Sequence, residues 1–260
     1  DDATPQAWPL PEEEIRQLLI EFWNATNGPY WTRLRWDFEG PWIEWPGISE
    51  GGSTGTFDLD MEENNLTGTF PTSFFELPLE YLSLRFNQLS GTIPLSICKS
   101  QTLDTLILQG NQMQGTLPEC LGEAPEISAL SLSNNQLTGT LPASIGNLHM
   151  LLVLILNNNN LSGTIPDEFG RLGKLRTLEL SNNQFSGTIP NSVHNMTMMT
   201  QLLLSNNQFE GQFPLEWINK FSKRITKLIL SHNRFSGPLE PLGHLNNVVV
   251  FSVAYNQFTA

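Results

Sequence analysis

The chain has 260 residues, of which 39% are hydrophobic and 15% carry a charge, and its formal net charge is −13. Such acidity argues against nucleic acid as a partner, because proteins that bind it present a basic stripe to the phosphates. The sequence contains no run of 18 or more apolar residues that would suggest a membrane-spanning helix.

The negative charge is concentrated near the N-terminus. Residues 1–80 carry 16 acidic and 3 basic side chains, whereas residues 81–260 carry 10 of each. A basic partner would therefore be attracted to the N-terminal end of the molecule.

The first predicted element is a helix that begins after Pro11. Proline and the three glutamates that follow it suit a helix N-terminus. Apolar residues then fall at helical spacing, and the segment NATNG at residues 24–28 is expected to end the helix. These apolar residues are Ile15, Leu18, Leu19, Phe22 and Trp23.

Tryptophans cluster in the same region, where six of the seven lie before residue 46. They are Trp8, Trp23, Trp31, Trp36, Trp42 and Trp45. We expect a buried plug, because the first unit of a repeat array exposes apolar surface unless a cap covers it. An aromatic platform for sugars is the alternative. Residues 1–56 are accordingly assigned to an N-terminal cap.

Residues 57–260 contain an internal repeat. ALSLSNNQLTGTLPASIGNL at residues 129–148 is followed 24 residues later by VLILNNNNLSGTIPDEFGRL. One asparagine per unit, always two residues before an apolar residue, keeps a spacing of 23 to 26 residues through nine units. These anchor asparagines are Asn64, Asn87, Asn111, Asn135, Asn159, Asn183, Asn207, Asn233 and Asn256.

Each unit divides into parts with different physical roles. Leu130 and Leu132 alternate with small residues, which predicts a short strand with one buried face. The anchor Asn135 is expected to turn the chain inward, and its amide to bond the backbone of its own unit and of the next. Gly139 permits an unusual backbone angle, and Pro142 ends the second short strand. Residues 143–148 then supply a helical or 3₁₀ return.

The consensus LxxLxLxxNxLxGxIP resembles the leucine-rich repeat family, in its 24-residue subclass typical of plant extracellular receptors. The cap sequences FWNATNGPYW and WIEWPGI resemble caps of algal, other protist and bacterial members, without the cysteine pair of land-plant receptors. The resemblance implies an α/β repeat solenoid: a curved array of about nine repeats at residues 57–260, short parallel strands on the concave face, and a helical N-terminal cap. We expect the array to be truncated at its C-terminus.

Two features favour an extracellular or cell-surface location. Cys98 and Cys120 lie in consecutive units, which stack about 4.8 Å apart, so a disulfide between them is reasonable and two buried thiols are the alternative. Four N-glycosylation motifs also occur. Their asparagines are Asn24, Asn65, Asn160 and Asn195.

We find no catalytic signature, metal-spaced cluster or phosphate-binding loop, and we predict neither an enzyme nor a cofactor. Binding is instead expected on the concave face, where the residues that flank the buried leucines point. The candidate ligand-binding residues there are Asp58, Asp60, Glu62, Tyr81, Ser83, Arg85, Phe86, Ile107, Gln109, Ile155, Asn157, Glu179, Leu203 and Ile229.

These candidates have three kinds of chemistry. Asp58, Asp60 and Glu62 would share one face and hold a basic peptide or a calcium ion, with simple solvated acidity as the alternative. Tyr81, Arg85 and Phe86 could stack on a sugar or peptide. The aliphatic residues, Leu203 among them, would be exposed partner contacts unless something covers them. These aliphatic residues are Ile107, Ile155, Leu203 and Ile229.

We therefore predict a non-enzymatic recognition domain, the ectodomain of a cell-surface protein, that binds a peptide, protein or glycan on its concave face. Membrane attachment would come from sequence beyond residue 260. A secreted glycanase inhibitor and a surface-coat or adhesion protein are alternatives. A regular threonine row adds an ice-binding protein as a further alternative. It consists of Thr69, Thr92, Thr116, Thr140, Thr164 and Thr188.

Overall fold

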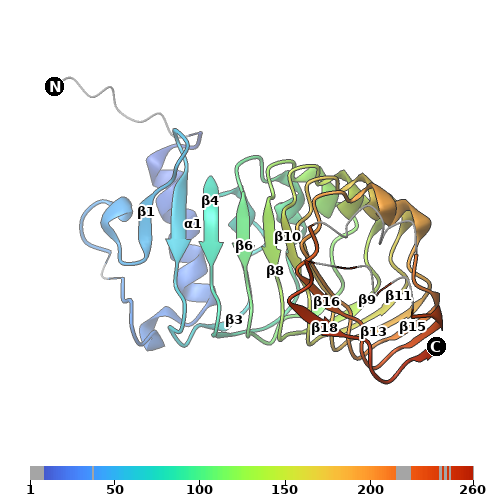
Figure 1. Ribbon diagram of the computed structural model, residues 1–260. Helices are drawn as coiled ribbons and strands as arrows, with labels where there is room; N and C mark the ends of the chain where they lie inside the picture. Colours follow the sequence, from blue (N-terminus) through green and yellow to red (C-terminus); the bar gives the residue numbers. More distant parts are fainter. Residues whose placement is uncertain are drawn as a thin grey trace.

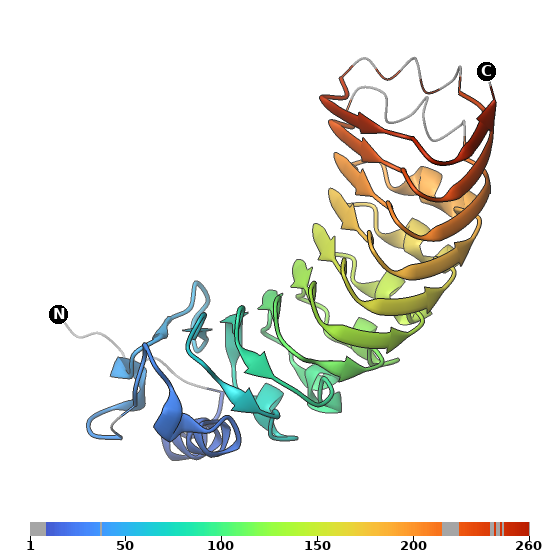
Figure 2. The ribbon, with the colours of Figure 1, turned by 90° about the horizontal axis from the view of Figure 1, so that it is seen from below.

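A computed structural model describes residues 9–36, 38–214, 224–239, 242, 245 and 247–259. The repeats stack side by side into an arc, and the N-terminal helix lies at one end of it (Figures 1 and 2). Parallel strands line the inner side of the arc, as the repeat pattern predicted.

The cap begins with helix α1 (Glu12–Ala25), in agreement with the predicted span. The helix buries Ile15, Leu18, Leu19 and Phe22 on one face. Thr26 follows it and donates a hydrogen bond from its hydroxyl to the Phe22 carbonyl at 2.7 Å. Two short 3₁₀ segments continue the cap, η1 (Gly28–Tyr30) and η2 (Trp42–Glu44).

The tryptophans between residues 31 and 45 form the predicted plug. The ring centroids of Trp31 and Trp36 lie 4.9 Å apart, and those of Trp36 and Trp45 lie 5.0 Å apart. None of the four is more than 5% exposed, so they cannot form an open sugar platform. Trp23 is only partly buried, and Trp8 lies outside the described residues. The four plug residues are Trp31, Trp36, Trp42 and Trp45.

The inner face of the arc is a ten-stranded sheet. It starts with an antiparallel pair, β1 (Ile48–Glu50) and β2 (Phe57–Asp60), and then adds one parallel strand per unit. These strands are β4 (Leu79–Ser83), β6 (Thr105–Ile107), β8 (Ala129–Ser131), β10 (Val153–Ile155), β12 (Thr177–Glu179), β14 (Gln201–Leu203), β16 (Lys227–Ile229) and β18 (Val250–Ser252).

A second set of short parallel strands, which we call the lateral sheet, follows the anchor asparagines. It comprises β3 (Thr67–Gly68), β5 (Gln88–Leu89), β7 (Gln114–Gly115), β9 (Gln136–Gly139), β11 (Asn160–Gly163), β13 (Gln184–Gly187), β15 (Gln208–Gln212), β17 (Arg234–Pro238) and β19 (Gln257–Thr259). The first two strands pair as a two-stranded sheet, and the other seven form one sheet. Short 3₁₀ segments complete the units. They are η3 (Phe74–Glu76), η4 (Leu95–Lys99), η5 (Leu121–Glu123), η6 (Ala143–Asn147), η7 (Asp167–Arg171) and η8 (Asn191–Asn195).

The anchor asparagines join each unit to the one before it. The Asn135 amide donates to the carbonyls of Leu108, in the preceding unit, and Leu132, in its own, at 2.9 and 3.1 Å. Its oxygen accepts from the Met113 amide, again in the preceding unit, at 2.9 Å. The expectation of bonds to the following unit was therefore wrong, because the side chain extends back toward the turn that the chain has just completed.

The Gly-Thr pair of the repeat has a packing role. Gly139 has a φ of +80°, which favours glycine, and a Cβ built on it would lie 2.7 Å from Cγ2 of Thr116 in the preceding unit. The same relation holds between Thr140 and Gly163. The threonine row is therefore explained first by the stacking of units.

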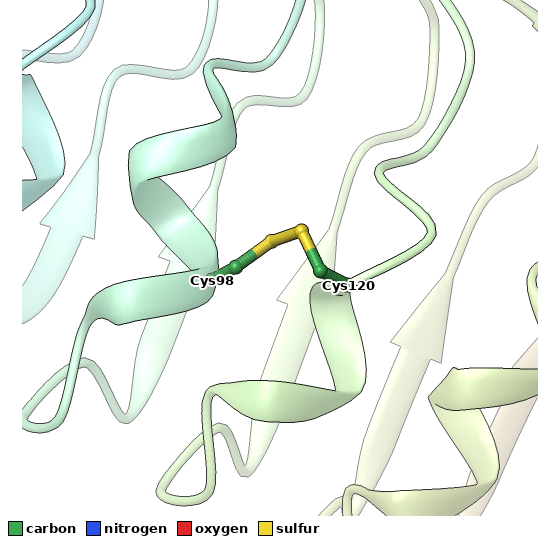
Figure 3. Close-up of a disulfide and its surroundings, with 2 residues drawn as sticks. All are labelled: Cys98 and Cys120. Atoms are coloured by element: carbon green, nitrogen blue, oxygen red, sulfur yellow. A yellow bond between two sulfur atoms is a disulfide. The ribbon is translucent and has the colours of Figure 1, made fainter.

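Cys98 and Cys120 form a disulfide that joins two adjacent units (Figure 3). Cys98 lies in η4, and Cys120 directly precedes η5. The bond closes a loop across a sequence separation of 22 residues, so it adds a covalent link to the hydrogen bonds between units.

Replacement of one anchor asparagine should destabilise the whole array. Asn111→Ala leaves the Leu89 amide and the carbonyls of Leu84 and Leu108 without their side-chain partners, at a site that is 8% exposed. Buried groups without partners cost about 1–3 kcal/mol each, so we expect a loss of about 2–4 kcal/mol in urea unfolding. Gln112→Ala, at the adjacent exposed position, is the control, and equal losses would contradict the assigned role.

Loss of the disulfide should also lower stability. Joint replacement of Cys98 and Cys120 by serine should decrease the free energy of unfolding by about 3 kcal/mol, because a loop of this length no longer constrains the unfolded chain. The reduced wild type should match the variant. Equal unfolding midpoints for the oxidised and reduced wild type would show that the bond adds no stability.

Candidate functional site

The concave face is the inner side of the arc (Figure 2). It is the side of the ten-stranded sheet opposite the buried leucines. Two rows of side chains run along it. The central row lies between the two leucines of each unit, and the terminal row follows the second leucine. The central row is Asp60, Ser83, Ile107, Ser131, Ile155, Glu179, Leu203 and Ile229, and the terminal row is Glu62, Arg85, Gln109, Ser133, Asn157, Ser181, Ser205 and Ser231.

The acidic end of this face is partly neutralised by arginines. Glu62 forms an ion pair with Arg85 of the next unit, which holds the pKa of Glu62 below its ordinary value. Glu63 pairs with Arg33 of the cap at 3.1 Å. Asp60 is exposed and accepts from the Glu62 amide at 3.3 Å. The sequence placed these charges on one face but did not indicate their pairing.

Asp58 differs from its neighbours because it is half-buried. Burial and the nearby Glu80 carboxylate raise its pKa, although a backbone hydrogen bond from Tyr81 opposes the shift. Its Oδ1 atom is buried and has no hydrogen-bond partner within the described chain. Among the described residues, no three His, Cys, Asp or Glu side chains come together as a metal site.

A pocket of about 340 Å³ adjoins this end, where the parallel strands begin. Glu80, Asp104 and Glu126 from three consecutive units line it together with Thr56. Glu80 accepts a hydrogen bond of 2.6 Å from the Thr56 hydroxyl, which lowers the pKa of its carboxyl. Carboxylates therefore surround both the end of the concave face and its edge.

Phe86 is an exposed aromatic residue with a left-handed backbone. Its φ is 56° and its side chain is 48% exposed, and the Arg85 guanidinium lies 5.7 Å from its ring centroid. A Cβ on Gly110 would meet the Phe86 ring at 2.7 Å, so the ring rests on the backbone of the next unit.

Every unit has a positive φ at the position directly before the anchor asparagine. Four units use asparagine there and one uses glycine, which tolerate this geometry, but Phe86 and Tyr255 are bulky. Tyr255 is 74% exposed and stacks on His232 at 4.2 Å. This row of left-handed positions was not predicted from the sequence. The replacement of asparagine by other residues at this position in some repeats could have indicated it. The row is Glu63, Phe86, Gly110, Asn134, Asn158, Asn182, Asn206, His232 and Tyr255.

The aliphatic part of the central row is less open than expected. Ile107, Ile155 and Ile229 are half-buried, but Leu203 is only 8% exposed. The expectation of an exposed Leu203 was therefore wrong, because it lies in register between Glu179 and Ile229 on the inner side of a curved sheet.

Ser83 is also buried, so it offers no surface to a ligand, contrary to expectation. It is a small residue in register between Asp60 and Ile107. Tyr81, Gln109 and Asn157 are half-buried and remain on the accessible face. Several serines of the terminal row are buried and form the floor of this face. They are Ser133, Ser181 and Ser231.

Glu179 is a carboxylate within an otherwise apolar stretch. It lies in register between Ile155 and Leu203 and accepts from the Ser181 amide at 3.2 Å. Burial raises its pKa, while the Ser181 hydrogen bonds and the Lys227 charge oppose the shift. Glu179 would therefore be stabilised by a donor or cation from a ligand.

The four glycosylation motifs differ in accessibility. Asn24, Asn160 and Asn195 are exposed. Asn65 is half-buried, and its oxygen accepts a 2.5 Å hydrogen bond from Gln88. Asn160 lies on the lateral sheet, away from the concave face. No helix among the described residues is both long and apolar enough to cross a membrane.

Comparisons with known proteins agree with this geometry. A family model described as "Leucine rich repeat" matches residues 125–185 and 151–209, and a second with the same description matches residues 78–100. A search of curated protein sequences gave no match.

Among solved structures, the chain is similar to the ectodomain of the Arabidopsis thaliana receptor kinase GASSHO1/SCHENGEN3 in complex with CASPARIAN STRIP INTEGRITY FACTOR 2. The identity is 39%, the match covers 77% of this chain and 24% of that one, and the TM-score is 0.74. The Arabidopsis receptor kinase HAESA, in complex with the peptide hormone IDA and the co-receptor SERK1, is 26% identical. That match covers 94% of this chain and 46% of that one, with a TM-score of 0.73.

A plant ice-binding protein shares the fold at 24% identity, with 95% of this chain and 88% of that one covered and a TM-score of 0.70. This chain thus spans less than half the length of the two receptor chains.

Glu179→Gln should make the protein more stable at neutral pH. Since the folded state raises the pKa of Glu179, its contribution to stability is present when the group is protonated and is lost as the pH rises through the folded pKa. We expect a higher Tm for the variant at about pH 7 and no difference at about pH 4, where glutamate is largely protonated. Glu210→Gln, at an exposed position, is the control for loss of one charge. A Tm difference independent of pH would contradict this account.

Proposed function

We propose that this chain, which belongs to the leucine-rich repeat family, is a non-enzymatic recognition domain that binds an extended peptide segment on its concave face. The proposal includes an extracellular or cell-surface location, which the exposed glycosylation motifs and the disulfide support. It identifies the chain as the ectodomain, or part of the ectodomain, of a cell-surface protein.

Phe86 carries this proposal. Left-handed backbone geometry is unfavourable for a side chain with a Cβ atom, by roughly 1–2 kcal/mol, and five of the nine units avoid the problem with asparagine or glycine. The second unit instead holds a half-exposed phenyl ring beside Arg85. Backbone strain that persists around an exposed aromatic side chain supports a role in ligand contact.

The charges on the face indicate which peptide would fit. Asp58 has a buried carboxylate oxygen without a hydrogen-bond partner in the described chain and Asp60 is exposed, whereas Glu62 is paired with Arg85. Farther along, Glu179 lies between the half-buried Ile155 and the buried Leu203. We infer a peptide with a basic group near the cap, aliphatic side chains along the central row, and a donor or cation opposite Glu179.

Similar structures support the peptide class. The HAESA ectodomain is described with a peptide hormone and a co-receptor, and GASSHO1/SCHENGEN3 with CASPARIAN STRIP INTEGRITY FACTOR 2. From these proteins we carry over to this chain only two features. The repeat array serves as a peptide-binding surface, and a second protein is a further partner.

Phe86→Asn should weaken peptide binding strongly without unfolding the protein. Relief of backbone strain, about 1 kcal/mol, should offset the lost ring contact with Gly110, so we expect the Tm to change by less than about 2 °C. Peptides first selected on the wild type from a random display library should bind the variant at least about tenfold more weakly, because an aromatic anchor is lost.

His232→Asn is the matched control, because it makes a similar replacement at the same backbone position six units away. It should leave affinity for the same peptides unchanged. A large fall in Tm for Phe86→Asn would assign Phe86 a structural role, and unchanged affinity would remove the second unit from the binding site.

A further inference from the structure

One edge of the concave sheet is formed by the segments that lead into its strands. Backbone hydrogen bonds join consecutive segments, such as the bond of 2.8 Å from the Arg176 amide to the Leu152 carbonyl. We call this edge the flank strip, and it follows one side of the arc at the starts of strands such as β4 and β6 (Figure 1). Its segments are 77–80, 101–104, 125–128, 149–152, 173–176, 197–200 and 224–226.

The two halves of the flank strip carry opposite charges. Its acidic side chains lie in the first three segments, and its basic side chains lie in two of the last three. The middle segment is apolar at its surface, because Met150 is 42% exposed and Leu152 is half-buried. The charged residues are Glu80, Asp104 and Glu126 at the acidic end, and Lys174, Arg176 and Arg224 at the basic end.

The repeat motif does not require this pattern. Stacking fixes one buried apolar residue in each segment, such as Leu151 or Leu175, and leaves the residues beside it free to vary. Leu152 is an example, because Ser128 and Arg176 occupy its position in the units before and after it. The charges and the apolar middle segment are therefore features of this chain rather than of the fold.

The cations at the basic end are available to a partner. The Lys174 Nζ atom lies 3.1 Å from the sulfur of Met150, and the Arg224 Nη1 atom lies 3.3 Å from that of Met198. A thioether is only a weak acceptor. Neither cation forms an ion pair with a carboxylate among the described residues.

The carboxylates at the acidic end are held in place. Glu80 accepts hydrogen bonds of 2.6 Å from the Thr56 hydroxyl and 2.8 Å from the Ser53 amide. Together with Asp104 and Glu126 it lines the pocket of about 340 Å³. A basic side chain from a partner would enter a hollow that already has carboxylates on three consecutive units.

These charges make the flank strip complementary to itself. Glu126 and Lys174 each lie one unit from the middle segment, on opposite sides of it. Glu80 and Arg224 each lie three units from it. A two-fold rotation that reverses the order of the units therefore places Glu126 of each copy opposite Lys174 of the other, and it brings Glu80 opposite the second arginine. The two Met150 side chains then meet at the centre, where protein interfaces are most apolar.

We propose that the flank strip is the interface of an antiparallel homodimer, with its two-fold axis at the middle segment. Seven segments about 4.8 Å apart extend over about 30 Å, which is long enough for an interface of about 800 Å² per partner. Exposed ion pairs add little affinity, so the apolar centre supplies the attraction and the charges select the antiparallel order. Phe86 follows the opposite end of β4, so this inference does not rest on peptide binding.

Reciprocal charge reversals test the proposal. Glu126→Lys places lysines opposite each other twice in the dimer, and Lys174→Glu does the same with glutamates, so each variant alone should dissociate. An equimolar mixture of the two should restore dimers, because every such contact then joins unlike charges. Asp167→Lys makes the same kind of change at an exposed position of η7, outside the strip, and is the matched control.

Association would be measured by sedimentation velocity. About 100 μM protein in about 50 mM salt would make a dimer with a Kd of about 10 μM the main species and leave its charges weakly screened. The full chain would be made in a host without N-glycosylation, because Asn195 lies three residues before Met198 of the strip. The Tm of each variant would confirm that it is folded.

We expect the wild type and Asp167→Lys to be mostly dimeric, and each reversal to weaken association at least about tenfold, because like charges then face each other. Met150→Asp should also dissociate the dimer, whereas Leu95→Asp, at a leucine that is 70% exposed outside the strip, should not. A monomeric wild type would overturn the proposal. A mixture of the two reversals that stays monomeric would overturn it too. Dimers that persist in both reversals would place the contact elsewhere, for instance at the exposed Val249 and Phe251, and would equally overturn it.

Discussion

The buried amide of the anchor asparagine is the interaction on which the rest of the structure depends. From the second unit onward it satisfies backbone groups of two consecutive units, and in the first unit Asn64 bonds the backbone of the cap, so the array cannot lose one such side chain without leaving buried groups unpaired. It also fixes the point at which the chain leaves the concave sheet and enters the lateral sheet. The hydrogen bonds of this turn therefore set the positions of both the concave face and the lateral face.

A scaffold stacked in this way keeps side chains on both faces at regular intervals, although the faces differ in chemistry. The concave face changes from carboxylates and an exposed aromatic ring near the cap to buried and half-buried aliphatic residues around Glu179. The lateral face keeps the same neutral groups through six units. Because each unit contacts only its neighbours, one surface can vary from unit to unit while the other stays uniform.

Sequence alone was sufficient for the architecture and insufficient for details of the site. Periodicity predicts the strands, the cap helix and the buried tryptophans, because each depends on contacts that recur or on a strong apolar pattern. Strand alternation also indicates which side chains point to the concave side. It does not indicate how neighbouring units cover them, which is why Ser83 and Leu203 were expected on the surface but are buried. The pairing of Glu62 with Arg85 and the left-handed backbone at Phe86 likewise depend on contacts between units.

The most direct measurement is a crystal structure of the chain with the tightest peptide selected from a random library. An extended peptide on the concave face, with one side chain against Phe86 and a donor or cation within hydrogen-bond distance of Glu179, is the predicted result. A peptide bound to the lateral sheet or to the 3₁₀ segments, with Phe86 and Glu179 still open to solvent, would contradict the assignment of the concave face as the recognition site.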